Sequence, residues 1–246
     1  MLSEERHQYI LAQLARRNRV VVSELCATLK VSLDTVRRDL KELEKAGKLL
    51  KVHGGAVAPD FHFPYQQAEV YARHEKQHIA RKAMRLIEDG MTLLAGGGTV
   101  MLELARMIPE NLKGTFFTVS PLVALEVTQR SRVEVILLAG RLLPDSYICT
   151  GSTVVAQLSG IRADLCLMGA NDLSIADGLT ESNWEVAQVK KAMLRAANKN
   201  AILCLSEKLG TSQKIQVCKS SELDILITEL APGATGKFAK AVTTVL

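Results

Sequence analysis

From about residue 75 onward, short apolar runs alternate with amphipathic helical patterns. The runs favour strands at 91–95, 114–119, 133–139, 164–169, 201–206 and 224–229. The amphipathic stretches favour helices at 75–88, 99–107, 121–130 and 184–197. Parallel strands that are covered on both faces are apolar throughout, and helices connect them. The alternation therefore predicts an α/β domain with a mainly parallel, buried sheet over residues 75–246.

Residues 1–58 show a different pattern, which predicts three short helices and a strand pair. The serines that favour N-caps at the three expected helices are Ser3, Ser23 and Ser32. A β-branched run at 19–22 favours a strand before the second helix. The third helix ends near Ala46, where Gly47 can adopt the left-handed conformation of a helix terminus.

The third helix is the most informative element of this module. Its apolar side chains recur at three- and four-residue spacing and predict one buried stripe: Leu33, Val36, Leu40 and Leu43. The same phase exposes Asp34, Thr35, Arg37, Arg38 and Lys41. Arginine reads guanine with two hydrogen bonds, and short hydroxyl side chains reach phosphates or base edges. The second and third helices, joined by a tight turn, therefore predict a helix-turn-helix.

Charge is concentrated in the same module. The net charge is +5, and residues 1–58 contribute four of these charges, from 11 Lys and Arg against 7 Asp and Glu. A basic patch on a small module favours a polyanion partner over a membrane surface, although a solvated charged surface is an alternative. The β-capable stretch at 49–52 and the pair Gly54-Gly55 predict a wing with Lys51 and His53 near its tip. A three-helix packing unit without a ligand is the structural alternative.

Residues 22–56 read VSELCATLKVSLDTVRRDLKELEKAGKLLKVHGGA. This segment resembles the DNA-binding signature of the DeoR family of bacterial transcriptional regulators. The resemblance implies a winged helix-turn-helix that binds double-stranded operator DNA, usually as a repressor. It implies recognition roles for Ser32, Thr35, Arg37 and Arg38, and wing roles for His53, Gly54 and Gly55. Lys51 stands where the family often has arginine, which keeps phosphate contact but not bidentate geometry.

Residues 59–74 are predicted to be a linker between the two domains. Pro59 and Pro64 favour an extended backbone in this stretch. The aromatic residues Phe61, Phe63 and Tyr65 are expected to dock on a domain or on a second subunit.

Two glycine- and hydroxyl-rich segments follow predicted strands of the second domain, AGGGTV at 95–100 and TVSP at 118–121. Ligands of open parallel sheets bind at the carboxyl ends of strands, where backbone N–H groups and helix N-termini favour anions. The Rossmann pattern fails because Met101 stands at its third glycine, and the chain has no Walker GK[ST]. The residues expected to form a phosphate cradle are Gly96, Gly97, Gly98, Thr99, Thr118 and Ser120. Ordinary tight packing of helix on strand is the alternative.

Later loops supply polar side chains suited to the hydroxyl groups of a sugar: Arg141, Asn171, Asp172, Glu181 and Lys208. The whole domain is similar to the DeoR-family sensor, whose fold is related to ribose-5-phosphate isomerase. This resemblance implies a phosphorylated sugar or related metabolite as effector, and a homodimer or homotetramer. The positions that match the family's ligand loops are Gly98, Thr99, Ser120, Gly151, Asp172 and Lys208.

The ligand loops also depart from the family pattern. The family commonly reads DSGTT where this chain has GGGTV at 96–100, and TNS where it has TVS at 118–120. It commonly reads D-x-S-K where this chain has LSEK at 205–208. Fewer polar groups change which ligand hydroxyls can be satisfied, so we expect altered ligand selectivity.

Two other functions are alternatives to a ligand-released regulator. A sugar-phosphate isomerase would need a carboxylate as general base, for which Glu181 or Asp172 is the candidate, because Gly96 stands at the family's acidic position. The second domain could instead act only as an oligomerisation scaffold. No catalytic residue, metal site or cofactor is predicted from the sequence.

The composition favours a soluble protein, with 48% hydrophobic and 23% charged residues. No apolar run approaches the ~20 residues of a membrane span. The charged start MLSEERHQ is unlike a secretory signal, so a cytoplasmic location is expected. The five cysteines are scattered and mostly lie in apolar runs, which favours buried thiols in a reducing compartment.

Overall fold

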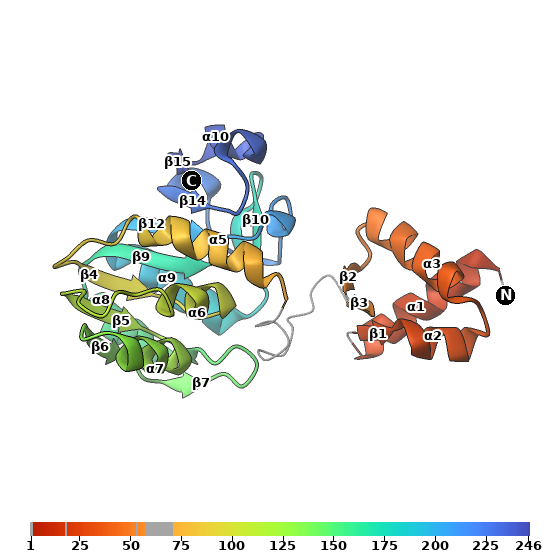
Figure 1. Ribbon diagram of the computed structural model, residues 1–246, viewed down its shortest axis with the longest axis horizontal. Helices are drawn as coiled ribbons and strands as arrows, with labels where there is room; N and C mark the ends of the chain where they lie inside the picture. Colours follow the sequence, from red (N-terminus) through yellow and green to blue (C-terminus); the bar gives the residue numbers. More distant parts are fainter. Residues whose placement is uncertain (1, 18, 53, 58–70) are drawn as a thin grey trace. The chain divides into compact units, whose positions relative to one another are not determined.

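The computed structural model describes residues 2–17, 19–52, 54–57 and 71–246. The chain divides into two compact units, Met1–His62 and Phe63–Leu246 (Figure 1). Most of the expected linker, 59–74, lies outside the described residues, as do its aromatic residues Phe61, Phe63 and Tyr65. The first helix of the second unit, α5 (Arg73–Met84), begins two residues before the expected position.

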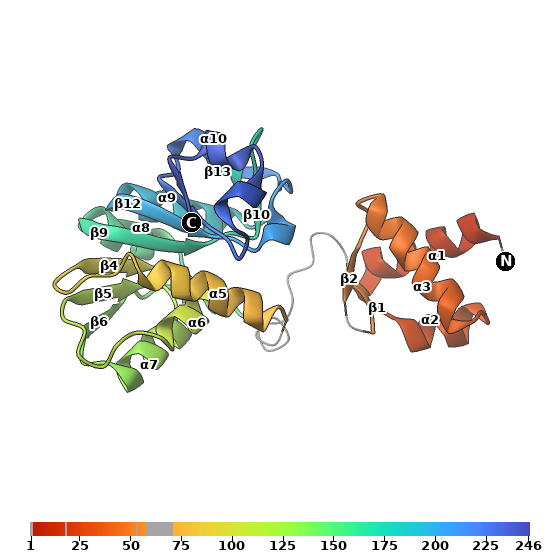
Figure 2. The same cartoon turned by 45° about the horizontal axis from the view of Figure 1, so that its top comes forward.

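Within its described residues, the first unit contains three helices and a three-stranded antiparallel sheet (Figure 2). The helices are α1 (Ser3–Arg17), α2 (Val22–Leu29) and α3 (Leu33–Lys45). The strands are β1 (Arg19–Val21), β2 (Leu50–Val52) and β3 (Gly55–Val57), with β3 in the middle. The three helices share one buried core, which includes Ile10, Leu14, Leu25, Leu29, Val36, Leu40 and Leu43. This arrangement is the predicted winged helix-turn-helix.

Most of the sequence signals for α3 are confirmed. Ser32 caps the helix, because its Oγ accepts a hydrogen bond from the Thr35 N–H at 3.3 Å. At the other end Gly47 has a φ of +67°, directly after the C-cap Ala46. The buried stripe consists of Val36, Leu40 and Leu43. The expectation for Leu33 is wrong: it is 45% exposed because the first turn of α3 lies beyond the buried core.

The second helix begins differently from the sequence prediction. Ser23 is not its N-cap; α2 begins at Val22, and Val21 occupies the cap position without a side-chain hydrogen bond. Strand β1 runs directly into this helix, and the Val22 N–H donates to the carbonyl oxygen of Gly54 at 2.8 Å. The wing therefore satisfies the first of the four amides at the start of α2 that have no partner within the helix.

Strands β2 and β3 form the expected wing. Gly54 has a φ of +80° at the reversal between them. A side chain on Gly55 would place its Cβ 2.0 Å from the carbonyl oxygen of Val20, so the close pairing of β3 with β1 requires glycine there. Lys51 is exposed on the wing, whereas the expected wing residue His53 lies outside the described residues.

A seven-stranded sheet forms the centre of the second unit, in the order β15-β14-β12-β9-β4-β5-β6. Every neighbouring pair in it is parallel, as predicted. The strands are β4 (Thr92–Ala95), β5 (Thr115–Thr118), β6 (Glu134–Leu137), β9 (Ala163–Gly169), β12 (Ala197–Leu203), β14 (Ile225–Ile227) and β15 (Thr244–Val245). Only the two-residue strand β15 lies outside the strand pattern read from the sequence.

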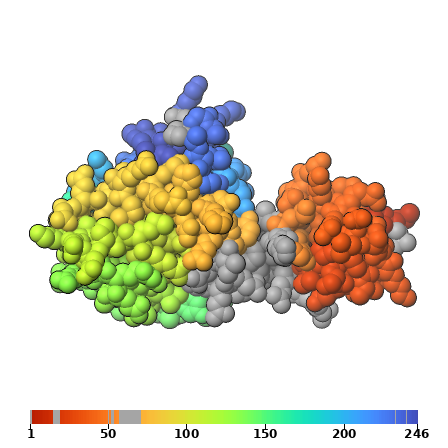
Figure 3. All heavy atoms as spheres, viewed as in Figure 1, coloured from red at the N-terminus to blue at the C-terminus, as the bar shows by residue number. Residues whose placement is uncertain are grey.

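Helices cover both faces of this sheet (Figures 1 and 2). Helix α5, α6 (Thr99–Ala105) and α7 (Pro121–Arg130) bury one set of side chains, Ile79, Met101, Leu104, Val123 and Val127. Helices α8 (Ser152–Ser159), α9 (Trp184–Arg195) and α10 (Phe238–Ala241) bury another, Val154, Leu158, Val189, Met193 and Phe238. In the space-filling view, α5, α6 and α7 hide the strands behind them (Figure 3).

Several short elements were not predicted from the sequence. A hairpin joins β7 (Arg141–Leu142) to β8 (Cys149–Thr150), just before helix α8. A small antiparallel sheet contains β10 (Asp172–Ser174), β11 (Gly178–Glu181) and β13 (Ile215–Cys218). One turn of 3-10 helix, η1 (Ser206–Lys208), follows β12. These elements surround the carboxyl ends of the parallel strands.

All five cysteines are free thiols, and four of them are buried as expected. Burial raises the pKa of Cys166 to about 12 and that of Cys218 to about 11. Both thiols are therefore protonated and unreactive at neutral pH. Across the described ranges, no helix combines the length and apolar character that crossing a bilayer requires.

Candidate functional site

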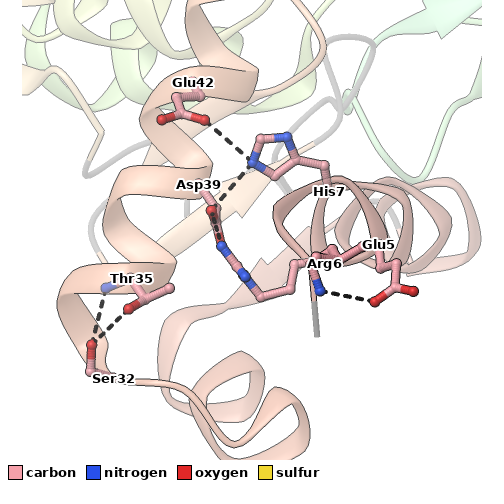
Figure 4. Close-up of polar contacts among 8 residues, drawn as sticks. Glu5, Arg6, His7, Ser32, Thr35, Asp39 and Glu42 are labelled. Atoms are coloured by element: carbon pink, nitrogen blue, oxygen red, sulfur yellow. Dashed lines mark hydrogen bonds and ion pairs between the residues drawn. The ribbon is translucent and has the colours of Figure 1, made fainter.

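The exposed face of α3 carries the side chains predicted to meet DNA. Asp34, Arg37, Arg38 and Lys41 are exposed, and Thr35 is half-buried. The Thr35 Oγ1 lies 2.9 Å from the Ser32 Oγ at the start of the helix (Figure 4). Three cations against one carboxylate give this face a net positive charge. It presents the groups that recognise phosphates and guanine bases.

A buried ion pair fixes α3 against α1 (Figure 4). Arg6 donates from Nε to Asp39 Oδ2 at 2.7 Å and from Nη2 to Asp39 Oδ1 at 2.9 Å. Burial alone would raise the pKa of Asp39, but the hydrogen bonds and charge of Arg6, together with His7, hold it below its usual value. Sequence reasoning missed this pair. The available signal was an acidic residue at 39 in phase with the buried stripe.

Two loops of the predicted phosphate cradle lie side by side at the carboxyl edge of the sheet. The Gly96 N–H donates to the carbonyl oxygen of Leu167 on β9 at 2.9 Å. A Cβ on Gly97 would lie 3.2 Å from the Ser120 Cβ, so the loop after β4 packs directly against the loop after β5. Gly98 has a φ of +100°, with no atom within 4 Å of where its Cβ would be.

Ser120 is the polar group of this edge that most suggests a ligand. Its side chain is fully buried, and its Oγ has no hydrogen-bond partner among the described residues. The neighbouring Thr118 is already engaged: its Oγ1 accepts from the Ser120 N–H at 3.1 Å and donates to the Gly96 carbonyl oxygen at 3.5 Å. An unsatisfied buried hydroxyl costs about 1–3 kcal/mol. A ligand oxygen at this point would remove that cost.

Gly151 belongs to the same edge. The Cys149 N–H, two residues before it, donates to the carbonyl oxygen of Val119 at 2.8 Å, which brings this loop beside the one that holds Ser120. Gly151 precedes α8 with a φ of +103° and ψ of 174°, almost the values of Gly98 before α6. The structure thus brings together seven of the predicted ligand residues, namely Gly96, Gly97, Gly98, Thr99, Thr118, Ser120 and Gly151.

Two other predicted ligand residues are engaged in ion pairs within the protein. Glu181 is buried, and its Oε2 accepts from the Lys190 Nζ at 2.7 Å. Arg141 is exposed and pairs with Glu185 at 2.5 Å. A carboxylate neutralised by a buried lysine is poorly suited to act as a general base, so the structure gives no support to a catalytic role for Glu181.

Asp172 is the first residue of β10 and Lys208 is the last residue of η1, and these two elements are neighbours. The Gly210 N–H donates to the carbonyl oxygen of Leu173 at 2.8 Å, which joins the loop after β12 to strand β10. Asp172 is buried, and Lys208 is half-buried at the end of η1. Burial raises the pKa of the nearby Cys204 thiol, on which the charges of Lys208 and Asp172 also act. A cation and a carboxylate therefore adjoin the end of β12.

Glu229 is a residue beside the candidate site that the sequence analysis did not single out. It follows β14, and its carboxylate accepts hydrogen bonds from the Ser206 N–H at 3.0 Å, from the Ser206 hydroxyl and from the Thr228 hydroxyl at 2.9 Å. Burial would raise the pKa of Glu229, but these hydrogen bonds lower it overall. Glu229 thus holds η1 in place through Ser206, which lies two residues before Lys208 in the sequence. The signal in the sequence was an acid directly after an apolar strand.

Comparison with known proteins supports two domains of regulatory type. The model of the DeoR-like helix-turn-helix domain matches residues 6–61, and that of the DeoR C terminal sensor domain matches residues 72–230. The HTH-type transcriptional repressor GlcR of Bacillus subtilis is 32% identical over 238 residues, which are 94% of this chain and 90% of that protein. The lactose phosphotransferase system repressor of Streptococcus mutans is 31% identical over 235 residues, 93% of each chain. Ribose 5-phosphate isomerase A of Methanocaldococcus jannaschii aligns with a TM-score of 0.40 at 18% identity, over 55% of this chain and 53% of that one.

The matched regions coincide with the two parts of the molecule that carry candidate sites. The first contains α3, its exposed arginines and the wing, and the second contains the glycine loops and Ser120. Both models are those of DeoR-type domains. This chain belongs to the DeoR family of DNA-binding transcriptional regulators.

Proposed function

We propose that this regulator is a cytoplasmic repressor of a carbohydrate operon, released from its operator by a phosphorylated sugar or a related metabolite. Two relatives support the repressor role by name, and one of them is the repressor of a lactose phosphotransferase system. The chain acts as a homodimer or homotetramer. Two copies of α3 then meet half-sites about one DNA turn, or a multiple of a turn, apart.

The DNA-binding half of the proposal assigns a role to each exposed group. Arg37 and Arg38 contact guanine edges or phosphates, and Lys41 contacts the backbone. Ser32 and Thr35 at the helix start reach phosphates, and Asp34 beside them disfavours an adjacent phosphate. The wing contacts the DNA backbone beside the half-site, through Lys51, His53, Gly54 and Gly55.

The ligand half rests on one observation: the hydroxyl of Ser120 is buried and has no hydrogen-bond partner in the described part of the chain. It lies against the Gly97 loop, where backbone N–H groups suit the phosphate of a ligand. Lys208 adds a positive charge, and Asp172 is suited to accept a hydrogen bond from a sugar hydroxyl. Because Gly96 replaces the family's acid, the ligand differs in its hydroxyl pattern from those of typical relatives.

Tyr71 links the start of the second unit to η1 beside this ligand site. It immediately follows residues 58–70, and its hydroxyl donates to the carboxylate of Glu207, next to Lys208. Lys76 donates from Nζ to the Tyr71 carbonyl oxygen and lies 5.7 Å from its ring. A ligand that moves η1 therefore changes the contact of Tyr71 with Glu207.

A mobility-shift titration tests both halves together. The DNA is the region upstream of the protein's own gene neighbourhood, at two salt concentrations, with and without a panel of sugar phosphates. We expect selective binding that one compound releases, and a Ser120→Ala variant that keeps operator binding but loses release. Ser159→Ala, an exposed serine of α8, is the matched control. Selective binding that no compound alters would contradict the ligand half, and binding without sequence preference would contradict the repressor itself.

A further inference from the structure

Leu33 is an exposed leucine at the start of the helix that faces DNA. It is 45% exposed and directly follows the N-cap Ser32. Arg37 lies one turn further on the same side of the helix, since residues four apart are neighbours. Among the residues that form the core of the first unit, Val36 is the first from α3, so Leu33 has no packing role there.

The position of Leu33 determines what it can meet. In helix-turn-helix proteins the N-terminal residues of the second helix contact base edges in the major groove. In that groove thymine carries a 5-methyl group, which proteins recognise by apolar contact. The neighbours Ser32, Asp34 and Arg37 recognise hydrogen-bonding groups and charges. None of them recognises a methyl group.

We propose that Leu33 is a specificity-determining residue of this regulator, which selects thymine by contact with its 5-methyl group. The proposal rests on DNA binding through α3. It adds a base preference that the arginines cannot supply.

The first turn is held rigidly enough to make such a contact selective. Ser32 caps it through the Thr35 N–H, and the Arg6–Asp39 pair fixes the middle of the helix against α1 (Figure 4). A side chain presented by a fixed backbone loses little entropy when it meets its target. The contact is also uncharged, so its contribution is independent of salt, in contrast to that of a phosphate contact.

The test compares thymine with deoxyuridine, which lacks only the methyl group. Full-length protein first selects its site from a random duplex pool. Each thymine of the selected site is then replaced singly by deoxyuridine, and the dissociation constant is measured by mobility shift. One buried methyl group corresponds to a roughly 3- to 5-fold loss of affinity. We expect this loss at one thymine of each half-site.

Variants link the loss to Leu33. Leu33→Ala should bind the thymine site roughly 3- to 5-fold more weakly than the wild type. The ratio of the two dissociation constants should be roughly the same at low and high salt. The variant should also bind the thymine and deoxyuridine sites equally well. Leu33→Met should keep the distinction. Leu2→Ala is the matched control, since Leu2 is an exposed leucine of the same unit at 72% exposure. Thermal unfolding of each variant verifies that the fold is retained.

Two results would overturn the inference: wild-type protein that tolerates deoxyuridine at every thymine, or a Leu33→Ala variant that retains the full penalty. Either result leaves the regulator function standing, because selective binding is still measured. Failure of the wild-type protein to select any DNA sequence would contradict the proposed function and this inference together.

Discussion

Arg6 on α1 and Asp39 on α3 are joined by two parallel hydrogen bonds, of 2.7 and 2.9 Å, inside the DNA-binding unit. The side chain of Asp39 is 2% exposed, so its charge depends on Arg6 for compensation. His7 lies next to the same carboxylate, with its Nε2 3.3 Å from Oδ1. The angle of the recognition helix is thus set by an ion pair as well as by apolar packing.

Replacement of Asp39 should destabilise this unit. In an Asp39→Ala variant Arg6 loses its partner, and we expect the free energy of unfolding to fall by about 3 kcal/mol. Asp34→Ala, on the exposed side of the same helix, should change it by less than about 0.5 kcal/mol. Urea unfolding followed by circular dichroism measures both. Equal stabilities of the two variants would show that the pair contributes nothing.

The same pair predicts a loss of stability in acid. The folded protein lowers the pKa of Asp39, so the carboxylate contributes stability above its unfolded value of about 3.9. That contribution is lost as the pH falls through this value towards the lower folded pKa. The urea concentration at the midpoint of unfolding should therefore decline less steeply between pH 6 and pH 2 in Asp39→Asn than in the wild type. A variant that declines in parallel with the wild type would exclude Asp39 as the group responsible.

Glu181 is expected to be a structural residue. Its buried pair with Lys190 means that Glu181→Gln leaves a lysine uncompensated, which should cost about 3 kcal/mol of stability. The double variant Glu181→Leu with Lys190→Met should recover most of this loss, because an apolar pair of similar volume needs no compensation. Chemical unfolding of the second unit measures both variants. A double variant that is less stable than Glu181→Gln would refute this explanation.

Gly97 should control the ligand response without affecting DNA binding. An alanine there would place its Cβ 2.7 Å from the Ile148 Cγ1 and 3.2 Å from the Ser120 Cβ, so the cradle must shift. Gly97→Ala should bind operator normally and respond at least 10-fold more weakly to the releasing compound, a loss of about 1.4 kcal/mol in ligand affinity. In the control Gly160→Ala the new Cβ makes an ordinary contact of 3.7 Å. An unchanged ligand response in Gly97→Ala would place the ligand elsewhere.

Long periodic patterns and both ends of α3 were readable from the sequence, whereas Ser3 and Ser23, which were expected as N-caps, lie inside α1 and α2. The stripe of Val36, Leu40 and Leu43 repeats over two turns, and Ser32 and Gly47 mark the ends of α3. Parallel strands of the second unit are covered by helices on both sides, so their apolar runs are continuous and easily recognised. The winged helix-turn-helix and the α/β architecture followed from these signals.

Features that depend on distant partners were not readable. The partners of Asp39 and Glu181 lie 33 and 9 residues away, and nothing in either local pattern names them. Strand β10 has only three residues and lies in no continuous apolar run, so neither its length nor its pattern identifies it as a strand. Leu33 has the helical phase of a core residue, but the phase does not reveal that the buried core reaches only as far as Val36. Tertiary context decides each of these cases.

The central claim is that the exposed face of α3 binds operator DNA selectively. The most direct measurement is the operator affinity of Arg38→Ala beside that of Arg132→Ala, whose exposed arginine lies in the second unit at 79% side-chain exposure. We predict a 10- to 100-fold weaker affinity for Arg38→Ala, about 1–3 kcal/mol, with the fold retained and with little change in the control. An Arg38→Ala variant that binds the operator as tightly as the wild type would contradict the account.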